Sequence, residues 1–423
     1  MDNSCAPVRK CGCFPLLMPL GSQNPTPNEV QMMQMNESVQ ANLPAAAEAD
    51  VDMPIQLVKD TGRRLASIDA LRGFDMFWLL QDETGLMLAL AALLHLPYQD
   101  VLAKQLDHTP WVGITAWDMI APLFLFIVGL TLPLSLESRR KRGESDGKIV
   151  SHILRRTVVL ILLGLVYNGI LQMQFADFRY TGVLQRIALS YVFAALITFF
   201  CKTRGQIAWT VALLLGYWAI MALIPVPGFG RNVMTPQGNL EGYIDRLFLP
   251  GKFCCYIFGD NEGYLSTIPS IATVMLGVLS SYLLKFRRSD QWKTMALLAG
   301  GVASILLGLL WSIWFPIITR LWTSSYTLLC NGVCMILFAV FFWIIDVKGY
   351  KKWAFFFIVI GMNPLLIYVL QEIIDFKGIG LGFLGGIASH SGAQQLLITA
   401  IGTVAAKWLF LYFLYRQKIF IKT

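Results

Sequence analysis

Long apolar stretches alternate with short polar segments along most of the chain. A helix needs about 20 apolar residues to cross a hydrocarbon core about 30 Å thick. Each such stretch therefore predicts one transmembrane helix, and the expected fold is an all-α, polytopic integral membrane helix bundle with about ten transmembrane helices. The predicted spans cover approximately residues 70–95, 112–135, 152–172, 181–201, 206–224, 264–284, 294–315, 323–345, 354–374 and 395–416.

The basic residues between these spans predict the orientation of the bundle. The loops of one alternating set, together with residues 56–66 and the C-terminal tail, carry 22 Lys and Arg, whereas the other set carries 7. Positive residues gather on the cytoplasmic side of membrane proteins. We therefore expect both termini in the cytoplasm, and we expect segments 96–111, 225–263 and 375–394 to be external.

The polar segments divide the chain into three predicted parts. Residues 1–60 lack a hydrophobic period and are expected to form a disordered cytoplasmic tail. Residues 63–416 form the transmembrane domain, and residues 225–263 form an external loop or lid within it. Segment 375–394 is apolar but glycine-rich, which favours a re-entrant or interfacial element.

Composition supports this assignment and excludes other classes. Charged residues make up 14% of the chain and hydrophobic residues 56%, whereas soluble domains carry roughly 25% charged residues. The net charge of +8 lies mostly in short loops, so we expect a lipid bilayer as partner and no nucleic acid. The eight cysteines show no metal-ligand spacing, so no metal is expected, while pairing of Cys254 or Cys255 stays open.

Several charged and amide residues fall inside the predicted spans. A charge there costs roughly 2.5–3.5 kcal/mol on insertion scales, so such residues tend to be functional. They lie mostly in the outer halves of their spans, near a histidine in the external loop. An alternative is a set of structural pairs, such as Asp118 with Arg186, and an interfacial loop histidine. The candidates are Asp82, Glu83, His108, Asp118, Gln185, Arg186, Asn331, Asn363 and Glu372.

A second group of candidates lies at the inner ends of two spans. Arg72 opens the first span, and Arg155 and Arg156 open the third. Guanidinium groups bind phosphates well, so this group is a candidate site for a phosphate-bearing ligand. The alternative is that these arginines are anchors for lipid headgroups.

Six sequence motifs in order resemble one enzyme family. They are SIDALRGFDM (67–76), DHTPWVGITAWDMIAPLFLFIVG (107–129), YTGVLQRIALSY (180–191), EGYLSTIPSIATVMLGV (262–278), LWTSSYTLLCNG (321–332) and GMNPLLIY (361–368). Together they resemble the heparan-alpha-glucosaminide N-acetyltransferase family, over roughly residues 63–416. The similarity is to bacterial membrane members that lack the luminal domain, which implies the bacterial inner membrane.

This resemblance implies transmembrane acetylation. Cytoplasmic acetyl-CoA would donate its acetyl group to the amine of a glucosamine-type sugar, or of an oligosaccharide, on the far side of the membrane. His108 occupies the place of the family's catalytic histidine, in the loop before the W-x-G…D…P-x-F-x-F-I-x-G span. The lysosomal enzyme has a functional asparagine where this chain reads Gln81-Asp82-Glu83, so the acceptor is expected to be held differently. A homodimer is one assembly we consider.

Chemistry assigns provisional roles to the candidates. His108 would act as a base or accept the acetyl group itself, and Asp118 would orient it. Asp82, Glu83, Gln185, Arg186, Asn331, Asn363 and Glu372 would bind substrate, and Arg72, Arg155 and Arg156 would bind the coenzyme's phosphates. Two other functions stay open: a sugar permease, and a membrane O-acyltransferase of surface polysaccharide.

Overall fold

The computed structural model of the chain describes residues 65–82, 85–95, 99–173 and 178–420, and almost all of its regular structure is helical. The predicted tail, residues 1–60, and Glu83 lie outside these residues. The helices are α2 (Ala66–Asp82), α3 (Leu86–Leu93), α4 (Gln99–Gln105), η1 (Trp117–Met119), α5 (Ile120–Lys141), α6 (Asp146–Tyr167), η2 (Ile170–Gln172), α7 (Val183–Phe200), α8 (Thr203–Leu223), α9 (Leu240–Phe248), α10 (Thr267–Lys285), α11 (Asp290–Trp311), α12 (Ser324–Phe341), the π-helical η3 (Phe342–Val347), α13 (Phe355–Gly361), α14 (Pro364–Leu370), α15 (Phe376–Ser389), η4 (Gly392–Gln394) and α16 (Gln395–Arg416).

The predicted all-α membrane fold is confirmed. Among the described residues, eight helices are long and apolar enough to cross a membrane, and they match eight of the ten predicted spans. A ninth crossing results if the bent pair α2 and α3 is counted as one span. The eight are Trp117–Lys141, Asp146–Tyr167, Val183–Phe200, Thr203–Leu223, Thr267–Lys285, Asp290–Trp311, Ser324–Val347 and Gln395–Arg416.

The other two predicted spans, 70–95 and 354–374, are broken. The first bends by 78° between α2 and α3, and Gly85, which precedes α3, has φ 62°. The second is divided into two seven-residue helices at Asn363. Pro364 starts α14 and explains this break, because proline has no N–H to donate and forces its preceding residue out of helical geometry.

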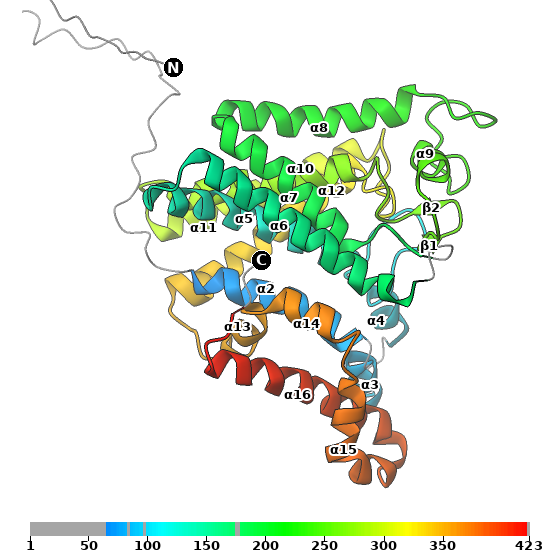
Figure 1. Cartoon of the computed structure of the whole chain (residues 1–423), viewed down its shortest axis with the longest axis vertical. Coiled ribbons are helices and arrows are strands. Elements are labelled where there is room, and N and C mark those ends of the chain that lie inside the picture. The colour runs from blue at the N-terminus through cyan, green and yellow to red at the C-terminus, as the bar shows by residue number, and fades with distance from the viewer. Residues whose placement is uncertain (1–64, 83–84, 96–98, 174–177, 421–423) are drawn as a thin grey trace, which may run out of the picture. The chain divides into compact units, whose positions relative to one another are not determined.

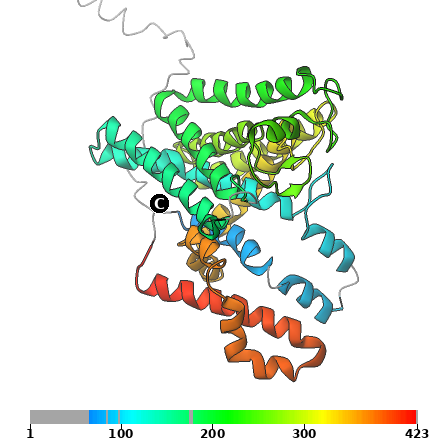
Figure 2. The same cartoon turned by 45° about the vertical axis from the view of Figure 1, so that its right-hand side comes forward.

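The helices pack in two groups (Figures 1 and 2). One group contains α5 to α12, with α10 packed against α5, α7 and α8. The other contains α2, α3 and α13 to α16, with α2 against α13 and α15 against α16. Helix α2 also packs against α5 and α12, so it joins the two groups.

Glycine lets two of these helix pairs approach to backbone contact. A methyl group added at Gly129 of α5 would lie 2.1 Å from the carbonyl oxygen of Val274 in α10. One added at Gly361 of α13 would lie 1.9 Å from the carbonyl oxygen of Asp69 in α2. Small residues at crossings favour close packing in membranes, where the hydrophobic effect does not draw helices together.

Loops gather at the end of the bundle where α6, α8 and α11 end and α7, α10 and α12 begin. We call it the external end, after the charge bias in the sequence. It holds α9 and the antiparallel hairpin of β1 (Cys255–Tyr256) and β2 (Gly259–Asp260), all within the predicted lid, 225–263. Bridges from Gly113 to Ile318 and from Arg179 to Gly251 tie other loops into the same layer.

Candidate active site

His108 and Asp118 meet at the external end. Asp118 lies in η1, at the start of the span that continues as α5, and its side chain is fully buried. Its Oδ2 atom accepts hydrogen bonds from the backbone N–H of Thr109 and of Thr115, at 3.3 and 3.1 Å, and from the Thr115 hydroxyl at 3.1 Å. The loop before α5 is therefore folded around this carboxylate.

The remaining carboxylate oxygen of Asp118 binds the histidine. Asp118 Oδ1 lies 2.7 Å from Nδ1 of His108, whose side chain is 43% exposed. When Nδ1–H donates to the carboxylate, Nε2 keeps its lone pair and can take a proton or attack an acyl carbon. The ring also contacts the edge of Trp117. This geometry is that of an oriented base at the mouth of the bundle.

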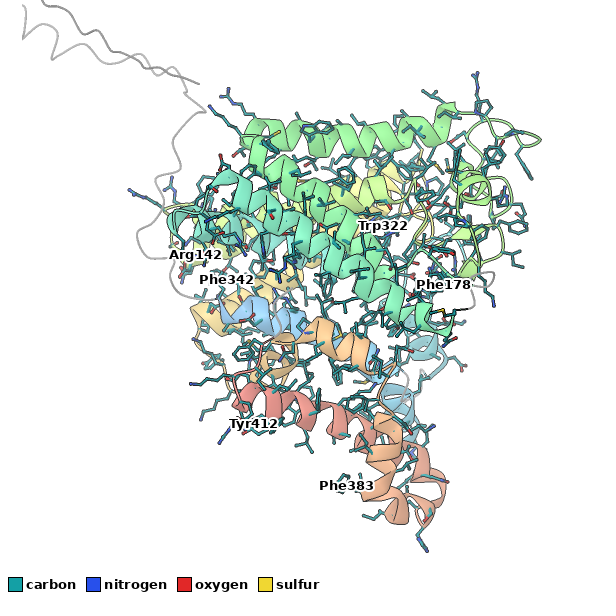
Figure 3. The ribbon with its side chains drawn as sticks, in the orientation of Figure 1. Arg142, Phe178, Trp322, Phe342, Phe383 and Tyr412 are labelled. Atoms are coloured by element: carbon teal, nitrogen blue, oxygen red, sulfur yellow. The ribbon has the colours of Figure 1, made fainter. Side chains whose placement is uncertain are left out.

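A chain of contacts leads from this dyad into the bundle. The Tyr326 hydroxyl donates to the backbone carbonyl of Asp118 at 2.5 Å, and its ring packs edge-on against Trp322. The guanidinium group of Arg186 lies over the Trp322 ring, 4.8 Å from its centroid. Figure 3 shows Trp322 inside the bundle, far from Arg142 at the opposite end.

Arg186 and Trp322 border a small cavity between α5 and α7. Its volume is about 20 Å³, and Glu262 also lines it. A cavity needs roughly 10–15 Å³ to hold one water molecule, so this space holds one water-sized group beside a guanidinium. Arg186 is buried and donates to the Ser266 hydroxyl. A carbonyl oxygen that gains negative charge would be stabilised here.

Arg179 clamps the predicted lid onto the bundle. Its guanidinium binds both carboxylate oxygens of Asp260, at 2.9 and 2.6 Å, and also binds Glu262. Asp260 is fully buried. Burial alone would raise its pKa, but the hydrogen bonds and charge of Arg179 outweigh burial and hold the pKa of Asp260 below its usual value.

Two further acids are buried on one face of α9. Glu241 and Asp245 are one helical turn apart, and both are fully buried. Burial raises the pKa of Glu241, and it raises the pKa of Asp245 to about 6. The sequence analysis missed this pair because acids in a polar external segment are expected to face water. Only their i, i+4 spacing in an otherwise irregular segment hints at a shared helix face.

The other predicted substrate-binding residues of the outer half have different surroundings. Gln185 is buried against Gly164 and Gly182, and its amide makes no hydrogen bond within the described residues. Glu372 is exposed just after α14, beside the hydroxyl of Tyr167, whose ring stacks on Tyr368. Asp82 ends α2 at the bend.

The two predicted asparagines make hydrogen bonds within the packing of the helices. Asn331 of α12 donates to the Ser304 hydroxyl of α11 at 3.1 Å, so it bridges two packed helices. Asn363 stands at the break between α13 and α14 and donates to the carbonyl of Ile419, near the C-terminus. These contacts give both amides a place in the packing, and their binding roles stay predictions.

The three predicted phosphate-binding arginines have different local surroundings. Arg72 of α2 lies 3.8 Å from Asp69. Arg155 of α6 is exposed, and Arg156 places its guanidinium 4.4 Å from the centroid of the Tyr191 ring in α7. Within the described residues, no group of histidine, cysteine and carboxylate side chains could hold a metal ion.

Comparisons with known proteins point to one family. The family model for heparan-alpha-glucosaminide N-acetyltransferase, catalytic, matches residues 64–309. The heparan-alpha-glucosaminide N-acetyltransferase of Mus musculus is 28% identical over 422 aligned residues, covering 86% of this chain and 61% of the mouse protein. The Homo sapiens protein of that name is 28% identical over 414, covering 85% and 60%. The chain thus spans about three fifths of the length of these relatives.

Proposed function

Because the chain belongs to the heparan-alpha-glucosaminide N-acetyltransferase family, we propose that it moves the acetyl group of cytoplasmic acetyl-CoA to the amine of a glucosamine-type sugar on the external side. The observation that carries this proposal is the His108–Asp118 dyad, which stands at the external end of a membrane bundle. A contact chain links the dyad to Arg186 in the interior.

The dyad fits the proton transfers of this reaction. An amino sugar must lose an ammonium proton before its nitrogen can attack a thioester. Once the ammonium proton has passed to solvent, the neutral amine attacks the thioester. Nε2 of His108 takes the second N–H proton as the C–N bond forms and the C–S bond breaks, and it then returns this proton to the departing thiolate, which becomes the thiol. Asp118 stabilises the imidazolium that exists in between. An acetyl-histidine intermediate uses the same geometry, with Nε2 attacking the thioester first.

Arg186 is the group best placed for the developing negative charge. Its guanidinium borders a cavity of about 20 Å³, which suits a thioester carbonyl oxygen. A preorganised cation in a water-poor site contributes several kcal/mol to transition-state stabilisation. Asp82 and Glu83 at the bend, with Gln185 and Glu372, are the proposed contacts of the acceptor.

The donor is proposed to enter from the opposite end. The nucleotide part of coenzyme A carries several phosphates and does not cross lipid, so its phosphates would stay near the basic inner loops. The structure begins α6 at Asp146, so Arg155 and Arg156 lie midway along this helix and do not open it as predicted, and Arg72 lies in the first half of α2. The assignment of this side to the cytoplasm rests on the charge bias of the loops. The bacterial inner membrane and the homodimer stay predictions.

Replacing His108 tests the proposal directly. Proteoliposomes loaded with labelled acetyl-CoA are incubated with a panel of external amino sugars, and acetylated product is measured. His108→Ala is expected to lower kcat by at least about 10²-fold, as losing a positioned base does. His390→Ala, at another exposed histidine, is the matched control and is expected to retain activity. Activity of His108→Ala close to wild type would remove the dyad from the reaction.

The competing functions predict different products. A permease would exchange unmodified sugar across the vesicle wall without acetyl-CoA, and an O-acyltransferase would give a base-labile ester instead of an amide. The donor side is tested separately by replacing Arg155 and Arg156 together with Gln. We expect a higher KM for acetyl-CoA with an unchanged acceptor KM. An unchanged KM for acetyl-CoA would leave both residues as lipid anchors.

A further inference from the structure

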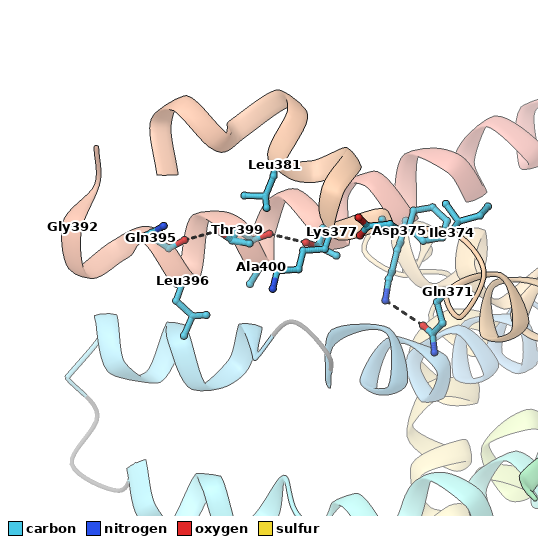
Figure 4. A pocket seen from close by; sticks show the side chains of 13 residues that line it. Gln371, Ile374, Asp375, Lys377, Leu381, Gly392, Gln395, Leu396, Thr399 and Ala400 are labelled. Carbon is cyan, nitrogen blue, oxygen red and sulfur yellow. Dashed lines mark hydrogen bonds between the residues drawn. The ribbon is translucent and has the colours of Figure 1, made fainter. Parts of the chain in front are cut away.

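A second, larger cavity lies between α15 and α16, away from the dyad. Its volume is about 680 Å³, within the range of sites that bind small molecules. The cavity reaches from Gln395, at the start of α16 (Figure 4), to Lys407, three turns further along the same helix. None of its lining residues belongs to the candidate active site or to the inner arginines.

The two threonine hydroxyl groups that line this cavity each donate their hydrogen to a backbone carbonyl of α16. Thr399 donates to the carbonyl oxygen of Gln395 and Thr403 donates to that of Thr399, each at 2.9 Å (Figure 4). A hydroxyl has one hydrogen and two lone pairs, so both oxygens keep their capacity to accept. Asp375 adds a carboxylate, of which Oδ1 caps α15 through the N–H of Gly378 at 2.8 Å.

The lining offers acceptors at Thr399, Thr403 and Asp375 and donors at Lys377 and Gln395, so it suits a ligand with several donors and acceptors. Sugar hydroxyls and an ammonium group supply such donors, whereas a phosphodiester offers only acceptors. Lys377 provides one cation that can bind a sugar oxygen. Leu381 and Leu396 also line the cavity, and their apolar surface matches the C–H face of a pyranose ring. This lining therefore favours a saccharide over a phosphodiester that brings no donor groups.

The floor of the cavity is connected to the bend between α2 and α3. Lys407 is 1% exposed, and its ammonium donates to the carbonyl oxygen of Leu80 and to Oε1 of Gln371, each at 3.2 Å. Beyond the bend, the Gln81 side chain accepts from the N–H of Met87 in α3. The cavity thus ends at the segment that contains Asp82, a proposed contact of the acceptor.

We infer that the cavity between α15 and α16 binds the saccharide of the acceptor, with Thr399, Thr403 and Asp375 accepting hydrogen bonds from its hydroxyl groups and from amino groups other than the one that is acetylated. The identification of this saccharide as the acceptor rests on the proposed function. The binding of an amino sugar does not require that any acetyl transfer occurs, so the two can be tested apart.

The test measures binding to the full chain in lipid nanodiscs without acetyl-CoA. The probes are glucosamine and a glucosamine disaccharide, and Kd is obtained from saturation-transfer NMR. The double variant Thr399→Val, Thr403→Val keeps side-chain shape and is expected to raise Kd about tenfold, from two lost hydrogen bonds. Thr210→Val is the matched control, because Thr210 makes the same type of bond to Gln206 in α8. It is expected to leave Kd unchanged.

The outcomes separate this inference from the proposed function. Threonine-dependent sugar binding by a chain that transfers no acetyl group would support the site and refute the proposed function. If acetyl transfer occurs and the double variant changes neither the Kd nor the KM of the acceptor, the proposed function would be supported and the site refuted. Absence of binding by the wild type, or loss of a bound phospholipid instead of the sugar in native mass spectrometry, would also overturn the inference. Asp375→Asn, which can still cap α15, is a second variant should the double variant misfold.

Discussion

Replacing Arg179 with alanine is expected to release the predicted lid. In the wild type, Arg179 makes two hydrogen bonds to Asp260 and also binds Glu262. The carboxylate of Asp260 is fully buried, and its other partners are the backbone N–H groups of Cys254 and Glu262. Arg179→Ala would therefore leave a buried negative charge without its cation.

The expected loss follows from this geometry. Removing one partner of a buried ion pair costs roughly 3–5 kcal/mol. The Arg179 side chain is 23% exposed, so we expect a value near the lower limit, about 3 kcal/mol at pH 7. The pKa of Asp260 is lowered, so the pair stabilises the fold above the carboxyl's ordinary pKa. That stabilisation is lost as pH falls through the lowered pKa of the folded state. The deficit of the variant should therefore shrink on acidification.

Thermal unfolding of the purified protein in detergent gives the global effect at pH 7.5 and at a pH below 3.8, the ordinary pKa of the Asp260 carboxyl. Hydrogen exchange of residues 251–263 reports whether the lid opens locally. Arg246→Ala is the control, because Arg246 is exposed and donates only to the carbonyl of Phe258 among the contacts described for it. Adding Asp260→Asn to Arg179→Ala should recover part of the loss, since a neutral amide does not need the guanidinium.

Two results would refute this reasoning. A loss below about 1 kcal/mol would mean that the pair behaves like an exposed one, screened by water. A loss that Asp260→Asn does not reduce would mean that Arg179 acts through packing and not through charge.

Three further substitutions test other parts of the structure. Asp118→Asn should lower kcat by about 10³–10⁴-fold with little change in acceptor KM, because an amide does not hold the reactive tautomer of the His108 imidazole. A pH–rate profile of this variant that matches wild type would contradict the prediction. Asp245→Asn should stabilise the protein above pH 6 by up to about 3 kcal/mol. The pKa of Asp245 in the wild type is raised to about 6, so wild-type stability is lost as pH rises through that value. Equal melting temperatures of the wild type at pH 4.5 and 7.5 would argue against this. Gly361→Ala should destabilise by more than about 2 kcal/mol, since its methyl would overlap the Asp69 carbonyl oxygen, whereas Gly216→Ala, which meets open space, should have little effect in the same melting assay.

The sequence predicts the continuous spans well because their signal is local. Each is a single apolar run of about 20 residues, and hydropathy measures that directly. The two broken spans have the same hydropathy, so hydropathy alone did not reveal the breaks. Pro364 was visible inside the segment 354–374, and its effect on Asn363 follows from steric rules. The bend after Asp82 has a weaker signal in Gly85.

The candidate site divides in the same way between local and tertiary signals. His108 and Asp118 lie in one loop, ten residues apart, so motif and spacing bring them together. Gln185 and Arg186 are neighbours in sequence but point about 100° apart around α7. Only Arg186 borders the Trp322 cavity, and which of the two does so depends on α5 and α12. The buried acids of α9 depend wholly on tertiary packing.

The partners of α2 have a consequence for how the protein is made. This helix is synthesised first among those described, yet it packs against α13, α14 and α16, of which the earliest begins at Phe355 and the last at Gln395. Its carbonyl at Leu80 receives the ammonium of Lys407 only when the last helix has entered the membrane. Until then α2, which contains the buried acid Asp75, lacks its contacts with α13, α14 and α16. A chain shortened after α12 would lack them permanently, and its first helix would be exposed to membrane quality control.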